Sequence, residues 1–376
     1  MPPFAAEIDL AAIRANVMEL RRRAGDAAVM AVVKADGYGH GMVPSARAAL
    51  TGGAGWLGVA LVDEAVALRA AGIEVPVLAW LVSPHTDLRP AAERSIDISV
   101  SAPWALDLAA AAAREVGRSV RVHLKADTGL GRAGAMPAEW RGLCEQAAKL
   151  AANGEISIVG VWSHLAYADS PSHPTIAAQK DRFDEALGVA ASIGVFPQVR
   201  HLANSAATLA LPQTHYDLVR PGVAVYGLSP GPEVGVAAEL GLRPAMRLRA
   251  DVALVKRVPA GQGVSYAHRY VTDRETTLAL VPLGYADGVP RHATNIGPVQ
   301  VGGRRFTISG TVCMDQFVVD VGDLDVGVGD EVVLFGAGDA GEPTADDWAQ
   351  AVGTINYEIV TRIGPRVPRT YREENA

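Results

Sequence analysis

The first 230 residues alternate short apolar runs with longer segments in which apolar residues recur at helical spacing. Eight apolar runs predict strands, at residues 30–35, 56–61, 75–81, 96–101, 120–125, 156–164, 199–203 and 218–226. Helices are predicted between them, among others at residues 63–71, 103–116, 137–152 and 175–193. Continuous apolar strands that alternate with helices indicate a parallel sheet covered on both faces. Eight such units predict a TIM-type (β/α)8 barrel, with a doubly wound open sheet as the alternative.

The pattern changes after Tyr226, where residues 227–244 are rich in Gly and Pro and are typical of a linker. Beyond it, runs rich in Val, Thr and Leu are separated by Gly and Asp, at residues 246–258, 276–283, 299–312, 316–321 and 331–335. These runs predict a mainly β domain. We therefore expect an α/β chain in which residues 10–235 form the barrel, while residues 1–9 and 236–376 form the mainly β domain.

Composition and charge narrow the classes of function. The 376 residues suffice for two domains, and 34 Lys and Arg against 41 Asp and Glu give a net charge of −7. No block of like charge exceeds Arg21, Arg22 and Arg23, so we expect no nucleic-acid partner. Neither a leader-like segment nor an apolar run of about 18 residues occurs, so we expect no membrane association. Two cysteines, Cys144 and Cys313, are too few for a disulfide framework and favour a cytoplasmic location.

Polar side chains follow the predicted barrel strands at their C-terminal ends, where barrels of this kind place their active sites. They are Lys34, Lys125, Asp127, Arg132, His164, Asn204, Ser205 and, within the eighth strand, Arg220. Lys34 ends the first strand and precedes a Gly-rich turn. The chain has only five lysines. Each of them is therefore a better candidate for a chemical role than a lysine of a lysine-rich protein would be, since arginine cannot replace lysine as a nucleophile. No metal site is predicted.

Lys34 allows two interpretations. Its alkyl stem can lie on the barrel rim with the ammonium in water. Alternatively, the cations Lys125 and Arg132 make it lose its proton more easily, so that its amine attacks a carbonyl and forms a Schiff base. Asn204 and Ser205 begin a polar segment beside the position where such barrels commonly bind phosphate. A nucleophilic lysine and a phosphate cradle together suggest pyridoxal phosphate, or aldolase chemistry on a sugar phosphate.

A set of motifs in fixed order covers nearly the whole chain. The lysine lies in AVVKADGYGHG (31–41), which is followed by KADTGLGRAG (125–134), SHLAYAD (163–169), HLANSA (201–206), RPGVAVYG (220–227), GVSYAHRY (263–270), GYADG (284–288), CMDQ (313–316) and TINYE (354–358). With these motifs the sequence resembles the alanine racemase family, with two slight departures: Gly37 where Ala is frequent and Ala267 where Gly is more usual. The resemblance implies pyridoxal 5'-phosphate as cofactor and interconversion of L-alanine and D-alanine, which supplies D-alanine for peptidoglycan.

The resemblance further implies two bases on opposite faces of the substrate's α-carbon, because a proton removed from one face must be returned to the other. Lys34 would hold the cofactor covalently and act as one base, and Tyr266 would be the other. A phenol is a weak base at pH 7, and lowering its pKa by about three units takes roughly 4 kcal/mol of preferential stabilisation. His164 beside Tyr266, with Arg220 beyond, is implied to supply it. The alternatives are a strand-end histidine and a tyrosine that only packs.

Two further cations receive roles from the resemblance. Arginine stays protonated, so Arg220 could only donate to the cofactor's ring nitrogen, which weakens the ring as an electron sink and favours racemisation over transamination. A structural arginine in a barrel strand is the alternative. Lys125 is implied to be carbamylated, which would create an anion that orients Arg132. An ordinary lysine paired with Asp127 is the alternative there.

The remaining implied roles concern binding and assembly. The implied cofactor contacts are Lys34, Tyr38, Arg132, His164, Asn204, Ser205, Arg220, Gly222, Val223 and Tyr357. The substrate carboxylate would meet Arg132 and the backbone of Met314, and Tyr285, Arg291 and Tyr357 would narrow the entrance. The implied assembly is a head-to-tail homodimer with active sites shared between chains. A broader-specificity or serine-type racemase and a non-catalytic pyridoxal phosphate carrier are the alternatives.

Overall fold

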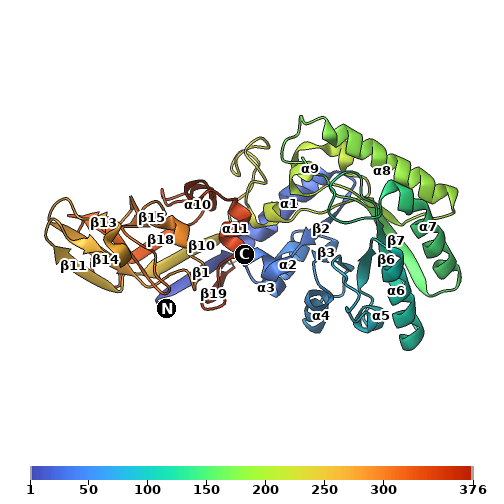
Figure 1. Ribbon diagram of the computed structural model, residues 1–376, viewed down its shortest axis with the longest axis horizontal. Helices are drawn as coiled ribbons and strands as arrows, with labels where there is room; N and C mark the ends of the chain where they lie inside the picture. Colours follow the sequence, from blue (N-terminus) through green and yellow to red (C-terminus); the bar gives the residue numbers. More distant parts are fainter. Residues whose placement is uncertain (1, 374–376) are drawn as a thin grey trace.

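The computed structural model describes residues 2–373 and is elongated, with a barrel at one end and a β domain at the other (Figure 1). Eight parallel strands form one sheet in the order β8-β7-β6-β5-β4-β3-β2-β9. Their bounds are β2 (Ala28–Val32), β3 (Trp56–Val59), β4 (Val77–Ala79), β5 (Asp97–Val100), β6 (Val120–Lys125), β7 (Ile156–Trp162), β8 (Val199–His201) and β9 (Leu218–Val219). Backbone hydrogen bonds from Asp217 to Arg200 and from Arg220 to Ala203, of 3.1 and 2.9 Å, join the two edges. The predicted barrel is confirmed and the open-sheet alternative is wrong.

Helices cover the outside of this sheet (Figure 1). They are α1 (Leu10–Ala24), α2 (Lys34–Tyr38), α3 (Met42–Thr51), α4 (Val62–Ala70), α5 (Arg89–Glu93), α6 (Pro103–Val116), α7 (Pro137–Ala152), α8 (Thr175–Ser192) and α9 (Ser205–Ala210), with the 3-10 turns η1 (Pro212–Thr214) and η2 (Val223–Tyr226). The bounds of α6 and α7 match those predicted. Both helices begin with a proline in the first turn, and Gly117 ends α6 at φ 71°.

Seven of the eight predicted barrel strands end earlier than expected, and two of these changes affect the site. The first strand ends at Val32, so Lys34 does not end it but begins the turn α2. The eighth ends at Val219, and residues 223–226 form η2 instead of continuing the strand. Pro221 has no N–H to donate to a strand ladder, which explains the break. Arg220 therefore follows its strand rather than lying within it.

The C-terminal part is mainly β, as predicted. Its largest sheet has the order β16-β15-β18-β10-β1-β19, and the smaller sheets are β11-β14-β17 and β12-β13. The bounds are β1 (Phe4–Asp9), β10 (Met246–Asp251), β11 (Leu254–Val258), β12 (Gly263–Val264), β13 (Tyr270–Val271), β14 (Thr276–Val281), β15 (Pro298–Val301), β16 (Arg304–Thr307), β17 (Phe317–Gly322), β18 (Glu331–Phe335) and β19 (Arg369–Arg372). Helical pieces are η3 (Tyr266–His268), η4 (Arg291–Ala293), α10 (Ala345–Val352) and α11 (Asn356–Thr361). The run predicted at 299–312 splits into the hairpin β15–β16 because Gly302 and Gly303 form a turn at positive φ.

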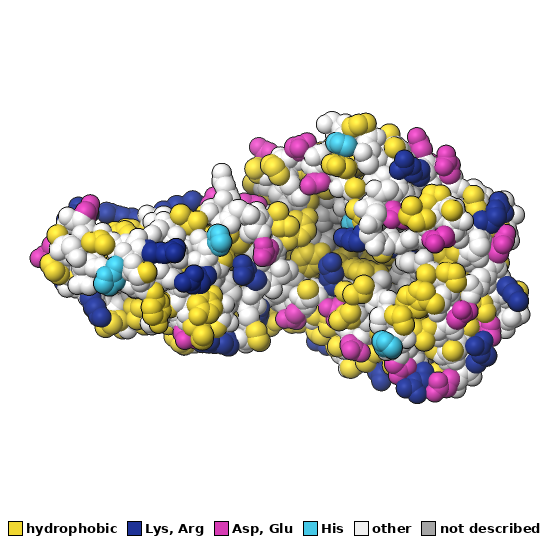
Figure 2. Space-filling model, viewed as in Figure 1, with side chains coloured by type: hydrophobic (Ala, Val, Ile, Leu, Met, Phe, Trp, Pro, Cys, Tyr) yellow, Lys and Arg dark blue, Asp and Glu magenta, His cyan; other side chains and the backbone are white. Residues whose placement is uncertain are grey.

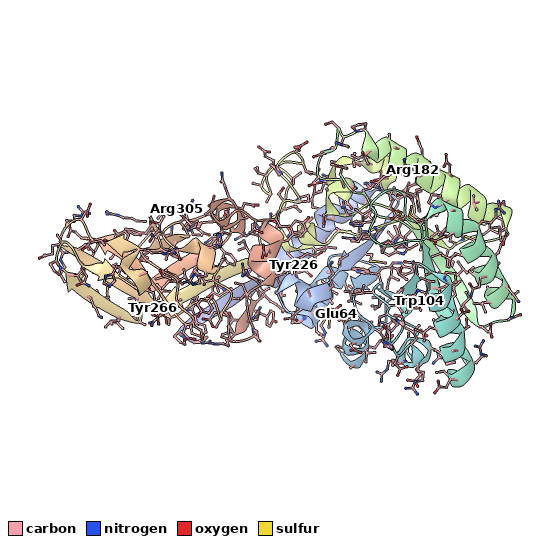
Figure 3. All side chains as sticks on the ribbon, in the orientation of Figure 1. Glu64, Trp104, Arg182, Tyr226, Tyr266 and Arg305 are labelled. Carbon is pink, nitrogen blue, oxygen red and sulfur yellow. The ribbon has the colours of Figure 1, made fainter. Side chains whose placement is uncertain are left out.

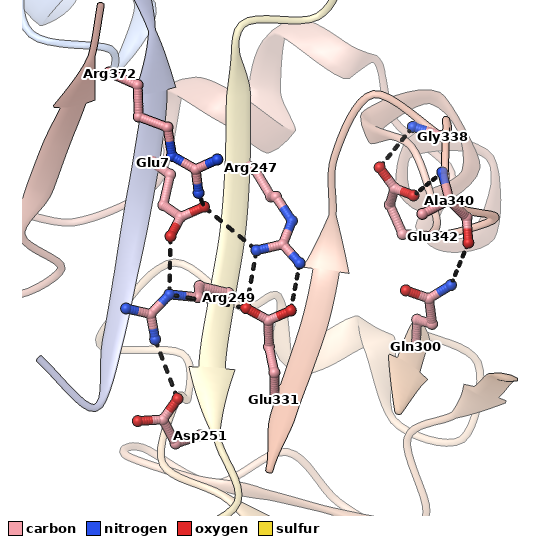
Figure 4. Close-up of polar contacts among 10 residues, drawn as sticks. All are labelled: Glu7, Arg247, Arg249, Asp251, Gln300, Glu331, Gly338, Ala340, Glu342 and Arg372. Atoms are coloured by element: carbon pink, nitrogen blue, oxygen red, sulfur yellow. Dashed lines mark hydrogen bonds and ion pairs between the residues drawn. The ribbon is translucent and has the colours of Figure 1, made fainter. Parts of the chain in front are cut away.

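The first and last strands belong to the same sheet. Strand β1 pairs antiparallel with β10 and parallel with β19. Glu7 on β1 accepts from Arg249 at 3.0 Å and from Arg247 at 3.3 Å, and it also bonds Arg372 on β19 (Figure 4). Because Glu7 is almost fully buried, these cations compensate a carboxylate that water does not reach.

The C-terminal strand also reaches the barrel. The Arg369 side chain donates to the carbonyl of Gly39 at 3.0 Å, directly after the turn that carries Lys34. A Cβ at Gly41 would lie 2.0 Å from the hydroxyl of Tyr371, so Tyr371 packs where only glycine fits. Among residues 2–373, no helix is long and apolar enough to cross a membrane, and Cys144 and Cys313 are both free.

Candidate active site

A cavity of about 460 Å³ lies at the C-terminal ends of the barrel strands. Figure 2 shows a hollow in the barrel, beside the β domain, with basic side chains near its edge. The cavity is lined by Val32, Lys34, Ala35, Tyr38, Trp80, Lys125, Arg132, Trp162, His164, Asn204, Ser205, Arg220, Gly222, Val223, Tyr357 and Thr361. Four of these side chains are cationic and none is a carboxylate, so the cavity favours an anionic ligand.

Lys34 stands at the start of an unusual turn. Residues 35–38 all have φ between 51° and 62°, the left-handed region, and three of them are not glycine. Such residues cost about 1–2 kcal/mol each. Hydrogen bonds offset this cost: the N–H of Ala35 donates to Glu64 at 2.7 Å, and the Asp36 carboxylate accepts from the N–H of Met42 at 2.8 Å. Gly37, the departure from the family pattern, lies at φ 62°, where glycine is unstrained.

The amine of Lys34 is partly withdrawn from water and close to aromatic rings. Its Nζ lies 5.7 Å from the ring centre of Trp80 and 6.0 Å from that of Tyr38. Burial lowers the pKa of Lys34, the charge of Arg132 lowers it further, and Glu64 opposes them. The environment therefore favours the uncharged, nucleophilic amine relative to an exposed lysine.

Arg220 is buried at the floor of the cavity. Its Nη2 donates to the carbonyls of Ser163 and Leu202 at 2.9 and 3.1 Å and lies 3.3 Å from Nδ1 of His164. Burial lowers the pKa of Arg220 to about 9, which leaves it a cation at pH 7. The pKa of His164 is well below its usual value because of burial first and Arg220 next, so His164 is neutral there.

Lys125 is the last residue of β6. It forms no ion pair with Asp127, so the alternative of an ordinary Lys125–Asp127 pair is wrong. Its Nζ lies 4.1 Å from the ring centre of Trp162. Asp127 instead accepts backbone N–H groups of the following loop, from Gly129 at 2.8 Å and from Leu130 at 3.0 Å. Burial, Arg220 and Arg132 lower the pKa of Lys125 to about 7.

Part of the cavity wall is built from hydroxyl groups and from backbone that packs closely against them. Ser205 Oγ accepts from the N–H of Gly222 at 2.8 Å and of Ala224 at 3.3 Å, which ties α9 to η2. A Cβ at Gly222 would lie 2.3 Å from the hydroxyl of Tyr38. The Tyr38 ring lies 5.0 Å from that of Tyr226 and 6.3 Å from that of Tyr357, which limits its movement.

Asn204, the residue before Ser205, caps α9, since its side chain accepts from the N–H of Ala207 at 3.1 Å. Sequence reasoning missed the wall residues Trp80, Trp162 and Thr361. Two of them could have been found, because Trp80 directly follows β4 and Trp162 ends β7, positions that face a barrel mouth.

Four predicted site residues do not line this cavity: Tyr266, Tyr285, Arg291 and Met314. All four lie in the β domain, and Figure 3 shows Tyr266 there, well apart from the barrel residues Tyr226 and Glu64. Tyr266 is 70% exposed. Next to it, Ala267 has φ 60°, a conformation that glycine adopts more easily. One chain thus brings together Lys34, Lys125, Arg132, His164 and Arg220 but not Tyr266.

Comparisons with known proteins agree over the whole chain. Residues 8–230 match the family model "Alanine racemase, N-terminal domain", and residues 245–371 match "Alanine racemase, C-terminal domain". The alanine racemase of Frankia casuarinae is 66% identical over 97% of this chain and 95% of its own, and that of Streptomyces coelicolor is 58% identical over 98% and 96%. The crystal structure of alanine racemase from Streptomyces lavendulae superposes with a TM-score of 0.97, at 58% identity, over 98% of this chain and 97% of that one. The structure from Bacillus anthracis, with bound L-Ala-P, has a TM-score of 0.90 at 36% identity, over 100% and 96%.

Proposed function

The chain belongs to the alanine racemase family, and from that premise we propose how its residues interconvert L-alanine and D-alanine. The proposal rests mainly on one observation. The amine of Lys34, whose pKa is lowered, lies in a cavity that is lined by three further cationic side chains and by no carboxylate. The D-alanine formed would serve peptidoglycan synthesis. The free cysteines favour a cytoplasmic setting for this work.

The residues present fit pyridoxal 5'-phosphate. The cavity offers an amine for covalent attachment, cations for a phosphate and a phenolate oxygen, and at Gly222 a backbone that Tyr38 approaches too closely for any side chain. Lys34 would hold the group covalently, and Tyr38, Asn204, Ser205, Gly222, Val223 and Tyr357 would surround its phosphate. When bound, this cofactor supplies an electron-withdrawing ring that makes the α-hydrogen of an amino acid acidic.

The protein contributes two proton-transfer groups. Lys34 Nζ takes or returns the proton on one face of the α-carbon, which the lowered pKa of Lys34 assists. The Tyr266 hydroxyl serves the other face. Because Tyr266 is exposed in the β domain and absent from the cavity of its own chain, we infer that it acts in the cavity of a partner subunit, in a two-fold homodimer.

Cations orient the other polar groups. Arg220 would donate a hydrogen bond to the ring nitrogen. Because Arg220 is itself a cation at pH 7 and can only donate, that nitrogen would accept the hydrogen bond unprotonated. Arg132, with the backbone of Met314, would hold the substrate carboxylate. Carbamylated Lys125 would orient Arg132. The pKa of about 7 of the unmodified Lys125 amine supplies the uncharged form that reacts with carbon dioxide. Tyr285, Arg291 and Tyr357 would narrow the entrance so that a methyl side chain passes.

The attachment is tested by reducing the purified protein with borohydride and digesting it. A pyridoxyl group is expected on the peptide that contains Lys34, and the unreduced protein should be yellow. Lys34→Ala should abolish both the label and racemisation, measured by chiral chromatography of alanine. Label on Lys125, which is also buried and easily deprotonated, would contradict the assignment.

The shared site is tested by mixing two inactive variants, Lys34→Ala and Tyr266→Phe, under conditions that let subunits exchange. In a mixed dimer, one site receives both defects and the other neither. Equal random mixing should therefore restore about a quarter of the wild-type sites. If both residues served one chain, every site would keep one defect and mixing would restore nothing.

A further inference from the structure

A line of polar side chains runs through the interior of the barrel, below the cavity. Arg220 Nη1 lies 3.1 Å from His201 Nδ1, His201 Nε2 lies 2.8 Å from His123 Nδ1, and His123 Nε2 lies 3.0 Å from Asp97 Oδ2. Asp97, His123 and His201 are 0% exposed. Asp97 begins β5, His123 lies within β6 and His201 ends β8, so the line rises from the closed end of the barrel to the cavity floor.

The strands are built to accommodate this line. A Cβ at Gly160 on β7 would lie 2.1 Å from His123 Nδ1, so only glycine leaves room for the histidine. At the same point the register between β6 and β7 shifts, with Val122 opposite Ile158 but His123 opposite Gly160. Glycine within a strand and a local bulge both weaken a sheet, and such bulges often re-aim side chains near active sites.

The end groups fix the direction of every hydrogen bond in the line. Arg220 can only donate, so His201 Nδ1 accepts, and the single ring hydrogen of neutral His201 lies on Nε2. His123 Nδ1 must then accept, which places its hydrogen on Nε2, facing Asp97. The carboxylate of Asp97 accepts it. Burial raises the pKa of Asp97, but the hydrogen bonds from His123 and Arg121 and the charge of Arg121 hold that pKa low. One arrangement of hydrogens satisfies all three contacts.

Building on the proposed racemase function, we propose that Asp97 is a positioning residue: through His123 and His201 it fixes the hydrogen-bond direction that holds Arg220 as a donor in the cofactor cavity. Among the residues that the structure describes, no carboxylate forms an ion pair with Arg220, and Asp97 is the carboxylate at the end of its hydrogen-bond chain. If Asp97 stopped accepting, the line could reverse and turn an N–H of His201 toward the guanidinium.

Asp97→Asn is the primary test, because the amide keeps the shape but adds two donors. In the wild type, Arg121 donates to Asp97 through Nε and through Nη2, the latter at 3.2 Å. The single amide oxygen of the Asp97→Asn variant can face either His123 or Arg121. Either choice sets a donor against a donor. Adding Arg121→Gln supplies an acceptor for the amide N–H and should rescue the original direction, while Arg121→Gln alone should change nothing in the line.

The first measurement is ¹⁵N NMR of histidine-labelled holoenzyme, with His123→Gln and His201→Gln to assign signals. In the wild type both rings should carry hydrogen on Nε2, and in Asp97→Asn at least one should carry it on Nδ1. The second measurement is the ratio of racemisation to conversion of alanine into pyruvate. That ratio should fall by roughly 10- to 150-fold in Asp97→Asn, the effect of losing one hydrogen bond to a charged group, and recover in the double variant.

Ile98→Val is the matched control, because Ile98 is the fully buried apolar neighbour of Asp97 on β5 and its side chain takes no part in the line. It should leave both the tautomers and the ratio unchanged. A wild-type ring with hydrogen on Nδ1, unchanged tautomers or ratio in Asp97→Asn, or an equal fall in Ile98→Val would each overturn the proposal. Failure of the racemase function would show separately, as a wild type that does not racemise alanine although its tautomers are measurable.

Discussion

Replacing Gly222 with alanine tests how closely the cavity wall is packed. The added Cβ would meet the Tyr38 hydroxyl at 2.3 Å and the ring carbon that bears it at 3.0 Å. Gly222 has φ −114°, outside the left-handed region that favours glycine, so the cost worked out here is that of the steric clash with Tyr38. The ring of Tyr38 cannot swing away freely, because the rings of Tyr226 and Tyr357 lie close to it, with ring centres 5.0 and 6.3 Å away.

Overpacking of this kind costs about 1–3 kcal/mol. For a cooperative unit the size of the barrel, we expect Tm of the cofactor-free protein to fall by roughly 2–12 °C. If the clash is instead relieved by moving Tyr38 into the cavity, the same energy should weaken pyridoxal phosphate binding by about 5- to 150-fold. The assays are differential scanning calorimetry and absorbance titration with the cofactor.

A second variant separates the clash from other effects. Tyr38→Phe removes the nearest atom, so the pair Gly222→Ala with Tyr38→Phe should lose less stability than the two single changes summed. Gly142→Ala is the control, since nothing lies within 4 Å of its Cβ in helix α7, and it should be neutral or slightly stabilising. Wild-type Tm and cofactor affinity in Gly222→Ala would refute the reasoning.

Two other substitutions give separate tests. Because the native pKa of Lys125 is lowered to about 7 while an unfolded lysine titrates near 10.4, the native state releases its proton first, and stability should rise with pH from about 7 to 10 by up to about 1.4 kcal/mol per unit. Lys125→Met should flatten that rise in urea unfolding at pH 7–9, and an equal slope in both proteins would contradict it. Arg220→Glu should let the ring nitrogen keep a proton, so that racemisation falls while pyruvate formation and long-wavelength absorbance rise. An unchanged product ratio and spectrum would mean that Arg220 does not govern that nitrogen.

Most barrel elements could be predicted from local sequence patterns. Strand β6 and helices α6 and α7 have the predicted bounds, because apolar alternation, an N-terminal proline and, for α6, a terminal glycine are all written within a few neighbouring residues. The eighth strand was predicted too long, because the apolar residues of η2 resemble a strand and the break at Pro221 was not taken into account. Helices α10 and α11 were not predicted at all.

Contacts between distant parts of the chain were beyond local signals. The pairing of Glu7 with Thr370 joins opposite ends of the sequence, and no periodicity encodes it. Asp97 and His123 are conspicuous as polar residues in apolar strands, yet their alignment with His201 depends on the register of the barrel. The strand-end rule did bring Lys34, Lys125 and His164 into one cavity, whereas it says nothing about Tyr266, which lies in the other domain.

Strand β19 makes the support of the lysine turn depend on residues that are synthesised much later than the turn itself. The turn that carries Lys34 is synthesised well before Arg369 and Tyr371, which secure Gly39 and Gly41 just beyond it, and the separation between Gly39 and Arg369 is 330 residues. A growing chain can fold its barrel helices and strands and still lack the final support of its own lysine turn. Catalytic competence should therefore appear only after residues 369–371 have left the ribosome, and a deletion of these residues should weaken the turn that carries Lys34.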